Sequence, residues 1–123
     1  MPKKALAQLT ESMFYLLLAL SQRPMCGIEA AEYIERLTKG RVQIGPATLY
    51  TVLARFEREK YITEIEVDGR RRTYAITEKG TEAVCAEMQR LRQCLDDAAA
   101  AAREGAKDGA DEVCLSAAAL PGV

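Results

Sequence analysis

The fold is decided by residues 45–80, GPATLYTVLARFEREKYITEIEVDGRRRTYAITEKG. Leucine, valine and phenylalanine side chains at positions 49, 52, 53 and 56 have the spacing that forms one apolar stripe along a helix. The Gly45-Pro46 pair before them suits a helix start, because the N–H that proline lacks has no partner in a first turn. The pattern predicts a helix from residue 46 to about residue 59.

The second half of this stretch predicts a β-hairpin and the start of another helix. Residues 61–67 and 70–76 look like strands, and Asp68-Gly69 between them is typical of a two-residue turn. Thr77 is a good N-cap and Glu78 is favourable in a first turn, so a helix is expected from there to about Arg103.

Two further helices are expected before residue 45. The first spans residues 10–21, with Thr10 or Ser12 as its N-cap, and apolar side chains cover almost its whole circumference. The second spans about residues 28–37 and ends with Gly40 as its C′ residue. Its expected core face is Ile28, Ala31, Ile34 and Leu37.

With a short extended segment at residues 41–44, these elements follow the order of a winged helix-turn-helix, a mainly α fold with a small β-hairpin. We expect a winged helix-turn-helix DNA-binding domain over residues 1–77, a C-terminal dimerisation helix over residues 78–103 and a flexible tail over residues 104–123. The tail is rich in glycine, alanine and acidic residues.

The apolar side chains of the first and last expected helices predict a homodimer, because one small domain would leave some of them exposed to water. In the last expected helix they recur at a 4-3-4 spacing, a narrow seam that suits packing against another helix. The first helix is apolar on all sides, so one side is expected to meet a partner subunit. The expected interface residues are Phe14, Leu17, Leu18, Val84, Met88, Leu91 and Leu95.

The side of the 46–59 helix opposite its apolar stripe combines small and basic residues. At about 100° per residue, this face holds Ala47, Thr51, Ala54 and Arg58, flanked by Tyr50 and Arg55. Small side chains let a helix enter a DNA major groove, and arginines at its edge can reach phosphates. An ordinary solvated face is an equally good interpretation of this pattern alone.

The second candidate element is Gly69-Arg70-Arg71-Arg72 at the expected hairpin tip. Strand alternation points Arg70 and Arg72 to one face and Arg71 to the other. Adjacent guanidinium groups repel one another unless anions or carboxylates lie near, and phosphate is a natural partner because arginine binds it bidentately. The alternative is a charged strand edge that prevents aggregation, for which one charge would suffice.

The net charge of −1 hides two opposite segments. Residues 36–77 contain nine basic and five acidic side chains, a net charge of +4, whereas residues 78–123 have a net charge of −4. The sequence therefore predicts a basic module joined to an acidic one, and the near-neutral total does not argue against DNA.

The composition argues against an enzyme and against a metal site. The chain has no histidine, the commonest general base and metal ligand near neutral pH, and its four cysteines have no C-x-x-C spacing. We expect no cofactor and no metal. The apolar run at residues 13–20 is too short to span a bilayer, so a cytoplasmic protein with free thiols is expected.

The joint spacing of several motifs resembles the PadR family of bacterial transcriptional regulators over about residues 8–95. The motifs are Ala47-Thr48-Leu49-Tyr50, Leu53-x-Arg55-Phe56-Glu57, Ile62, and Gly69-Arg70-Arg71-Arg72-x-Tyr74-x-Ile76-Thr77-x-x-Gly80. The resemblance implies a dimeric winged helix with the 48–58 helix in the major groove, residues 69–72 on the DNA backbone, and the first and last helices in the dimer. The sequence departs from the family at Lys60-Tyr61, where many members have a glycine.

The predicted function is a dimeric regulator, a repressor that binds a palindromic operator in double-stranded DNA and is released by a small-molecule effector. The expected DNA-binding residues are Lys39, Arg41, Ala47, Thr48, Tyr50, Thr51, Arg55, Arg58, Gly69, Arg70, Arg71 and Arg72. The alternative is a winged-helix interaction module that places its arginine-rich wing on an acidic protein.

Overall fold

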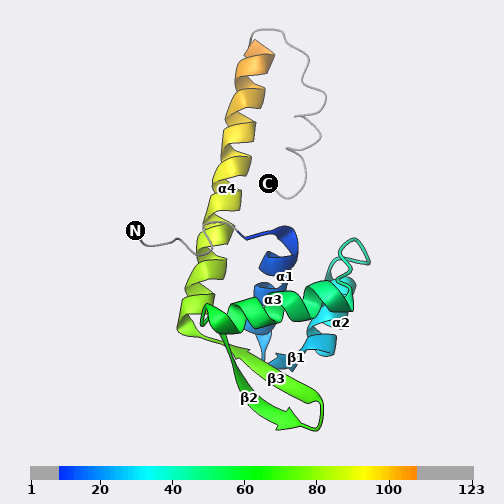
Figure 1. The fold of residues 1–123 in the computed structure, drawn as a ribbon. Helices are drawn as coiled ribbons and strands as arrows, with labels where there is room; N and C mark the ends of the chain where they lie inside the picture. The colour runs from blue at the N-terminus through cyan, green and yellow to red at the C-terminus, as the bar shows by residue number, and fades with distance from the viewer. Residues whose placement is uncertain (1–8, 108–123) are drawn as a thin grey trace. The chain divides into compact units, whose positions relative to one another are not determined.

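A computed structural model describes residues 9–107 of the chain. Its elements are α1 (Glu11–Gln22), β1 (Met25–Cys26), α2 (Gly27–Leu37), α3 (Pro46–Arg58), β2 (Ile62–Asp68), β3 (Arg71–Ile76) and α4 (Glu78–Lys107) (Figure 1). They form two compact units, of which the first ends at Glu87 and the second begins at Met88, so α4 contributes to both. The four helices and the small sheet confirm the predicted winged helix.

Three helices of the first unit begin at residues that are typical of a helix N-terminus. The Thr10 hydroxyl accepts the N–H of Met13 at 3.2 Å, which selects Thr10 over Ser12 as the first N-cap. Gly45 and Pro46 begin α3 as predicted. The Thr77 hydroxyl accepts the N–H of Gly80 at 3.1 Å and begins α4.

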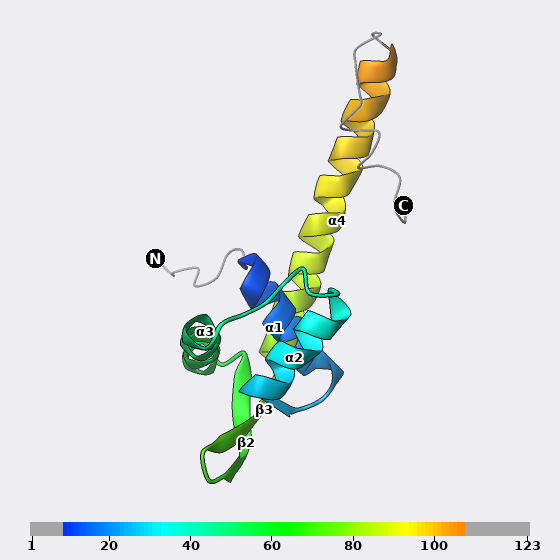
Figure 2. The same ribbon diagram turned by 90° about the vertical axis from the view of Figure 1, so that its right-hand side faces the viewer.

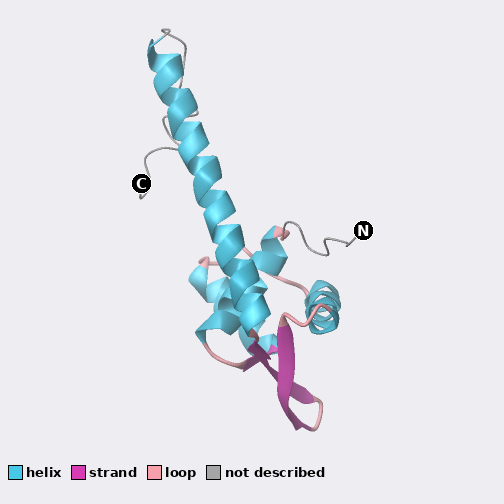
Figure 3. Ribbon diagram, turned by 90° about the vertical axis from the view of Figure 1, so that its left-hand side faces the viewer, coloured by secondary structure: helices cyan, strands magenta, loops and turns pink. Residues whose placement is uncertain are grey.

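The three strands form one antiparallel sheet in the order β1-β3-β2 (Figure 3). Asp68 pairs with Arg71, so the loop of the hairpin is Gly69-Arg70, one residue later than predicted, and Gly69 has the positive φ of 66° that this turn needs. The β2–β3 hairpin extends away from α1, α2 and α3 as a two-stranded wing (Figure 2).

The short extended segment predicted at residues 41–44 forms no strand, and the first strand, β1, lies earlier, at Met25–Cys26. Met25 pairs with Tyr74 and Cys26 with Thr73. The strand β1 therefore forms by pairing with the edge of β3 that β2 does not occupy. Residues 41–44 instead form a loop that the Thr38 hydroxyl holds by accepting the N–H of Val42 at 3.0 Å.

The core of the first unit is built from α1, α2, α3 and the sheet. Its fully buried large side chains are Phe56, Leu16, Leu17, Met25, Ile34 and Leu53. The predicted stripe on α3 is confirmed, with Val52 half-buried at its margin.

The predicted core face of α2 is confirmed for Ile34, which is buried, and Ala31, which packs against the core, and is wrong for Ile28 and Leu37. Ile28 and Leu37 are 59% and 48% exposed, and the buried positions are Gly27, Ala30 and Ile34. The face is rotated because α2 packs through its smallest residues: a Cβ at position 27 would already lie 3.2 Å from the Leu53 Cδ1 atom.

The second unit contains the later part of α4, which continues to Lys107, past the predicted end at Arg103. Residues 98–102 are five consecutive alanines, which have the highest intrinsic helix propensity and favour this extension. Residues 104–107 are therefore helical rather than part of a flexible tail. The rest of the predicted tail, residues 108–123, lies outside the described residues.

Two helices end in the same hydrogen-bonded motif with a lysine in the left-handed conformation. At the end of α3, the N–H of Tyr61 binds the Phe56 carbonyl at 2.8 Å and that of Lys60 binds the Glu57 carbonyl at 3.1 Å. Lys60 has a φ of 68°. At the end of α2, Lys39 occupies the C′ position with a φ of 55°, so Gly40 lies one position later than predicted.

Replacing Lys60 with glycine is expected to stabilise the protein by about 0.5 kcal/mol. The left-handed conformation costs an L-residue about 1 kcal/mol, and the greater backbone entropy of glycine in the unfolded chain offsets part of the gain. Urea unfolding measures the difference. The control is Lys60→Ala, which removes the charged side chain but keeps the Cβ and gains nothing; an equal gain from alanine would contradict the backbone explanation.

Candidate nucleic-acid interface

The predicted outer face of α3 is exposed along its whole length. Leu49, Leu53 and Phe56 are buried on the opposite side. The exposed residues are Ala47, Thr48, Tyr50, Thr51, Ala54, Arg55 and Arg58. This face therefore has small side chains along its centre and two arginines towards its C-terminal end, a shape that fits a groove with phosphates at its walls.

The three wing arginines differ in their partners. The Arg71 Nη2 donates to the Glu29 Oε2 at 2.9 Å, and the Arg72 Nη1 donates to the Glu64 Oε1 at 3.4 Å. Arg70 lies in the turn and forms no ion pair with any described residue. The predicted alternation begins at Arg71 rather than Arg70, because the turn is one residue later.

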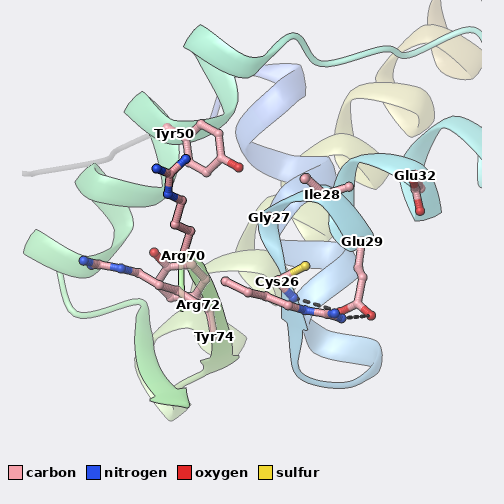
Figure 4. Close-up of a pocket in the computed structure, with 10 residues that line it drawn as sticks. Cys26, Gly27, Ile28, Glu29, Glu32, Tyr50, Arg70, Arg72 and Tyr74 are labelled. Atoms are coloured by element: carbon pink, nitrogen blue, oxygen red, sulfur yellow. Dashed lines mark hydrogen bonds and ion pairs between the residues drawn. The ribbon is translucent and has the colours of Figure 1, made fainter. Parts of the chain in front are cut away.

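A groove of about 680 Å³ lies between the N-terminus of α2, Tyr50 of α3 and the wing (Figure 4). The three wing arginines line it together with Tyr50, which is 51% exposed. Tyr74 forms its base within the sheet, and burial raises the pKa of the Tyr74 phenol. The groove therefore brings Tyr50 of α3 and the wing arginines together.

Sequence reasoning missed the carboxylates that line this groove. Glu29 is 42 positions before Arg71, so neither helix spacing nor strand alternation links the two. Glu32, one turn further along α2, also lines the groove. The sequence shows an acidic residue near the start of α2, but its arginine partner can be identified only when the position of β3 is known.

Of the twelve predicted DNA-binding residues, four line the groove (Tyr50, Arg70, Arg71 and Arg72), and Lys39 and Arg41 lie on neither α3 nor the wing. Arg41 donates to the Glu11 carboxylate at 3.0 Å and to the Tyr15 hydroxyl at 2.8 Å, and both partners are on α1. Lys39 is exposed at the C-terminal end of α2. Neither residue lines the groove, which lies at the other end of α2.

The predicted dimer residues divide into core and surface. Leu17 and Val84 are buried within the first unit, so they are core residues that a partner cannot touch. Phe14 and Leu18 are half-buried against that core. Met88, Leu91 and Leu95, in the second unit, are exposed.

Residues 9–107 contain neither a candidate metal cluster nor a candidate membrane-spanning helix. No group of three or more potential ligands in this range could hold a metal ion. No helix of the same range is long and apolar enough to cross a membrane. Within it, Cys26, Cys85 and Cys94 are free thiols, and Cys114 lies outside the described residues.

Comparison with solved structures finds the same fold. A transcriptional regulator from Clostridium thermocellum (Cth-833) is 27% identical, with a TM-score of 0.59 over 69% of this chain and 89% of that one. A PadR family transcription regulator from hypervirulent Clostridium difficile R20291 is 18% identical, with a TM-score of 0.58 over 67% and 88%. RosR from H. salinarum is 21% identical, with a TM-score of 0.57 over 77% and 97%.

No curated protein matches the sequence of the chain. The model of the Transcriptional regulator PadR-like family matches residues 16–86, from the second turn of α1 into the start of α4. This range includes the whole of α2, α3 and the wing and is more than half of the chain. The chain therefore belongs to the PadR-like family of transcriptional regulators and is not an enzyme.

Proposed function

We propose that the chain is a homodimeric, cytoplasmic repressor that binds a palindromic operator in double-stranded DNA and leaves it when a small molecule binds. One observation carries the DNA-binding part: Tyr50, on the exposed face of α3, and the three wing arginines line the same groove. A helix for the major groove and a cationic hairpin for the phosphates are then supplied by one rigid unit.

The roles of the two elements follow from their side chains. Tyr50, Thr51 and Ala54 lie on the exposed face of α3, where they would meet base edges. Gly69 to Arg72 at the wing tip would lie on the backbone, because guanidinium groups bind phosphate oxygens. Arg70 supports this role, since its charge has no ion-pair partner among the described residues.

The dimer is supported by the exposed apolar seam of the second unit. Met88, Leu91 and Leu95 follow one another at helical spacing and are 41%, 38% and 57% exposed. The same seam on a second copy is a complementary partner by two-fold symmetry. Two copies would also present two α3 helices to the two halves of a palindrome.

Release by an effector is carried over from the resemblance to PadR regulators. No aromatic side chain occurs between Thr77 and Arg103, so this part of α4 cannot bind an aromatic effector by stacking against its ring. We therefore propose an effector bound through apolar contacts at the dimer interface.

The chain is expected to form a specific complex with the DNA upstream of its own gene, with two chains per duplex and a steep dependence on salt. Arg71→Ala should weaken binding about tenfold on specific and unrelated duplexes alike, because a charged hydrogen bond to phosphate carries no sequence information. Gel-shift titrations at several salt concentrations measure both effects.

The control for this experiment is Arg90→Ala, which removes the same charge from the side of α4 opposite Met88 and Leu95. It should bind DNA as the unchanged protein does. Absence of any complex at low salt would contradict the proposed function.

A second function, an interaction module for an acidic protein, is favoured by two apolar side chains on the wing. Ile65 and Val67 of β2 are each 54% exposed beside the arginines. Apolar contacts suit a protein surface better than a DNA backbone. A partner that stays bound in excess duplex DNA would support this alternative.

A further inference from the structure

We infer that Glu29 is a positioning residue of the wing, whose carboxylate ties Arg71 to the N-terminus of α2 and holds it ready to meet the DNA backbone. This inference rests on the proposed contact between the wing and DNA.

The two carboxylate oxygens of Glu29 have different partners. Its Oε1 accepts the backbone N–H of Cys26 at 3.0 Å, and its Oε2 accepts the Arg71 Nη2 at 2.9 Å (Figure 4). Cys26 is both the N-cap of α2 and the last residue of β1, which pairs with β3. One side chain therefore connects α2, β1 and the tip of the wing, where β3 begins at Arg71.

The contact restricts an arginine that is otherwise mobile. The Arg71 side chain is 57% exposed, so without Glu29 it would sample many rotamers. The guanidinium has five N–H donors and gives one of them to Glu29, which leaves the others for a phosphate. Glu29 thus lowers the entropy that Arg71 loses on binding DNA.

The other wing arginines have no such link to a helix. Arg72 pairs with Glu64, which belongs to the hairpin itself, and Arg70 has no ion pair among the described residues. The hydrogen bond from the Cys26 N–H, more than the charge of Arg71, lowers the pKa of the Glu29 carboxyl. The carboxylate is therefore charged at neutral pH.

A negative charge in a DNA-facing groove also repels phosphate, and this second effect has the opposite sign. If Glu29 acted by repulsion, its neutralisation would strengthen binding. Glu32 provides the matched control, because it lines the same groove from the same helix and forms no ion pair with a described residue. Glu32→Gln should leave the affinity unchanged or raise it.

The test is a double-mutant cycle with the full chain and a fluorescent duplex that carries its own upstream region. Glu29→Gln keeps an oxygen for the Cys26 N–H but loses the charge that holds Arg71. We expect it to weaken DNA binding about three- to tenfold, the cost of ordering one long side chain in each of two subunits. In the Arg71→Ala background, Glu29→Gln should change the affinity less than about twofold.

The outcomes separate this inference from the function on which it rests. Loss of affinity that disappears in the Arg71→Ala background supports the inference, as does a salt slope for Glu29→Gln that falls towards that of Arg71→Ala. Unchanged or increased affinity of Glu29→Gln overturns it, and so does an equal loss in both backgrounds. Absence of DNA binding by the unchanged chain overturns the proposed function itself.

Discussion

Glutamate in place of Ala54 is expected to abolish specific DNA binding in a protein that stays folded. Ala54 is exposed at the centre of the proposed groove-facing side of α3. A carboxylate there would enter the major groove between two rows of phosphates, where it would be desolvated without a partner. One such unpaired buried charge costs about 2 to 3 kcal/mol or more, so the affinity should fall at least about 30-fold.

We expect Ala54→Glu to stay folded, because an alanine-to-glutamate change at an exposed helix position lowers the free energy of unfolding by only about 0.5 kcal/mol. Ala86→Glu is the matched control: it adds the same charge at an exposed position of α4 within the first unit. Fluorescence anisotropy with the operator duplex measures binding, and urea unfolding checks the fold. Retained operator binding by Ala54→Glu would show that α3 does not lie in the groove.

Local sequence was sufficient for the elements whose hydrophobic pattern and caps agree. The α3 stripe, the start of α3 at Gly45-Pro46 and the N-cap Thr77 were predictable because each depends on residues within one or two turns, whereas the sequence left Thr10 and Ser12 both open as the first N-cap. The exposed face of α3 follows automatically once its buried face is known. Many PadR-family members have a glycine where this sequence has Lys60-Tyr61, and this difference also proved informative. Lys60 adopts the left-handed conformation that glycine would adopt more easily.

Sequence was insufficient where a feature depends on distant parts of the chain. A two-residue strand such as β1 has no periodicity, and it forms only because the edge of β3 is available. The α2 face was predicted from its largest apolar residues, whereas close packing selected Gly27 and Ala30. The Glu29–Arg71 contact joins a helix start to a hairpin, so it emerges only from the tertiary fold.

The largest expected effect on stability is that of Gly80→Ala. Gly80 lies in the first turn of α4, which rests on the backbone of Tyr61: the N–H of Thr77 donates to the Tyr61 carbonyl at 2.9 Å. A Cβ at position 80 would overlap that same carbonyl oxygen and would lie 2.8 Å from the Ile76 Cγ1. Because the nearest atom is backbone, no rotamer change relieves the clash, and the first turn of α4 must move.

Forcing this contact apart should cost about 2 to 3 kcal/mol, a large part of the stability of a domain this small. The midpoint of thermal unfolding should fall by about 10 to 20 °C. Gly45→Ala is the control, because a Cβ at that N-cap has no atom within 4 Å and no positive φ, and its effect should stay near 0.5 kcal/mol. Equal midpoints for the two variants would mean that α4 can shift on Tyr61 without loss. A selective loss in Gly80→Ala would instead show that the close approach of Gly80 to the Tyr61 carbonyl, just before β2 of the wing, is needed for full stability.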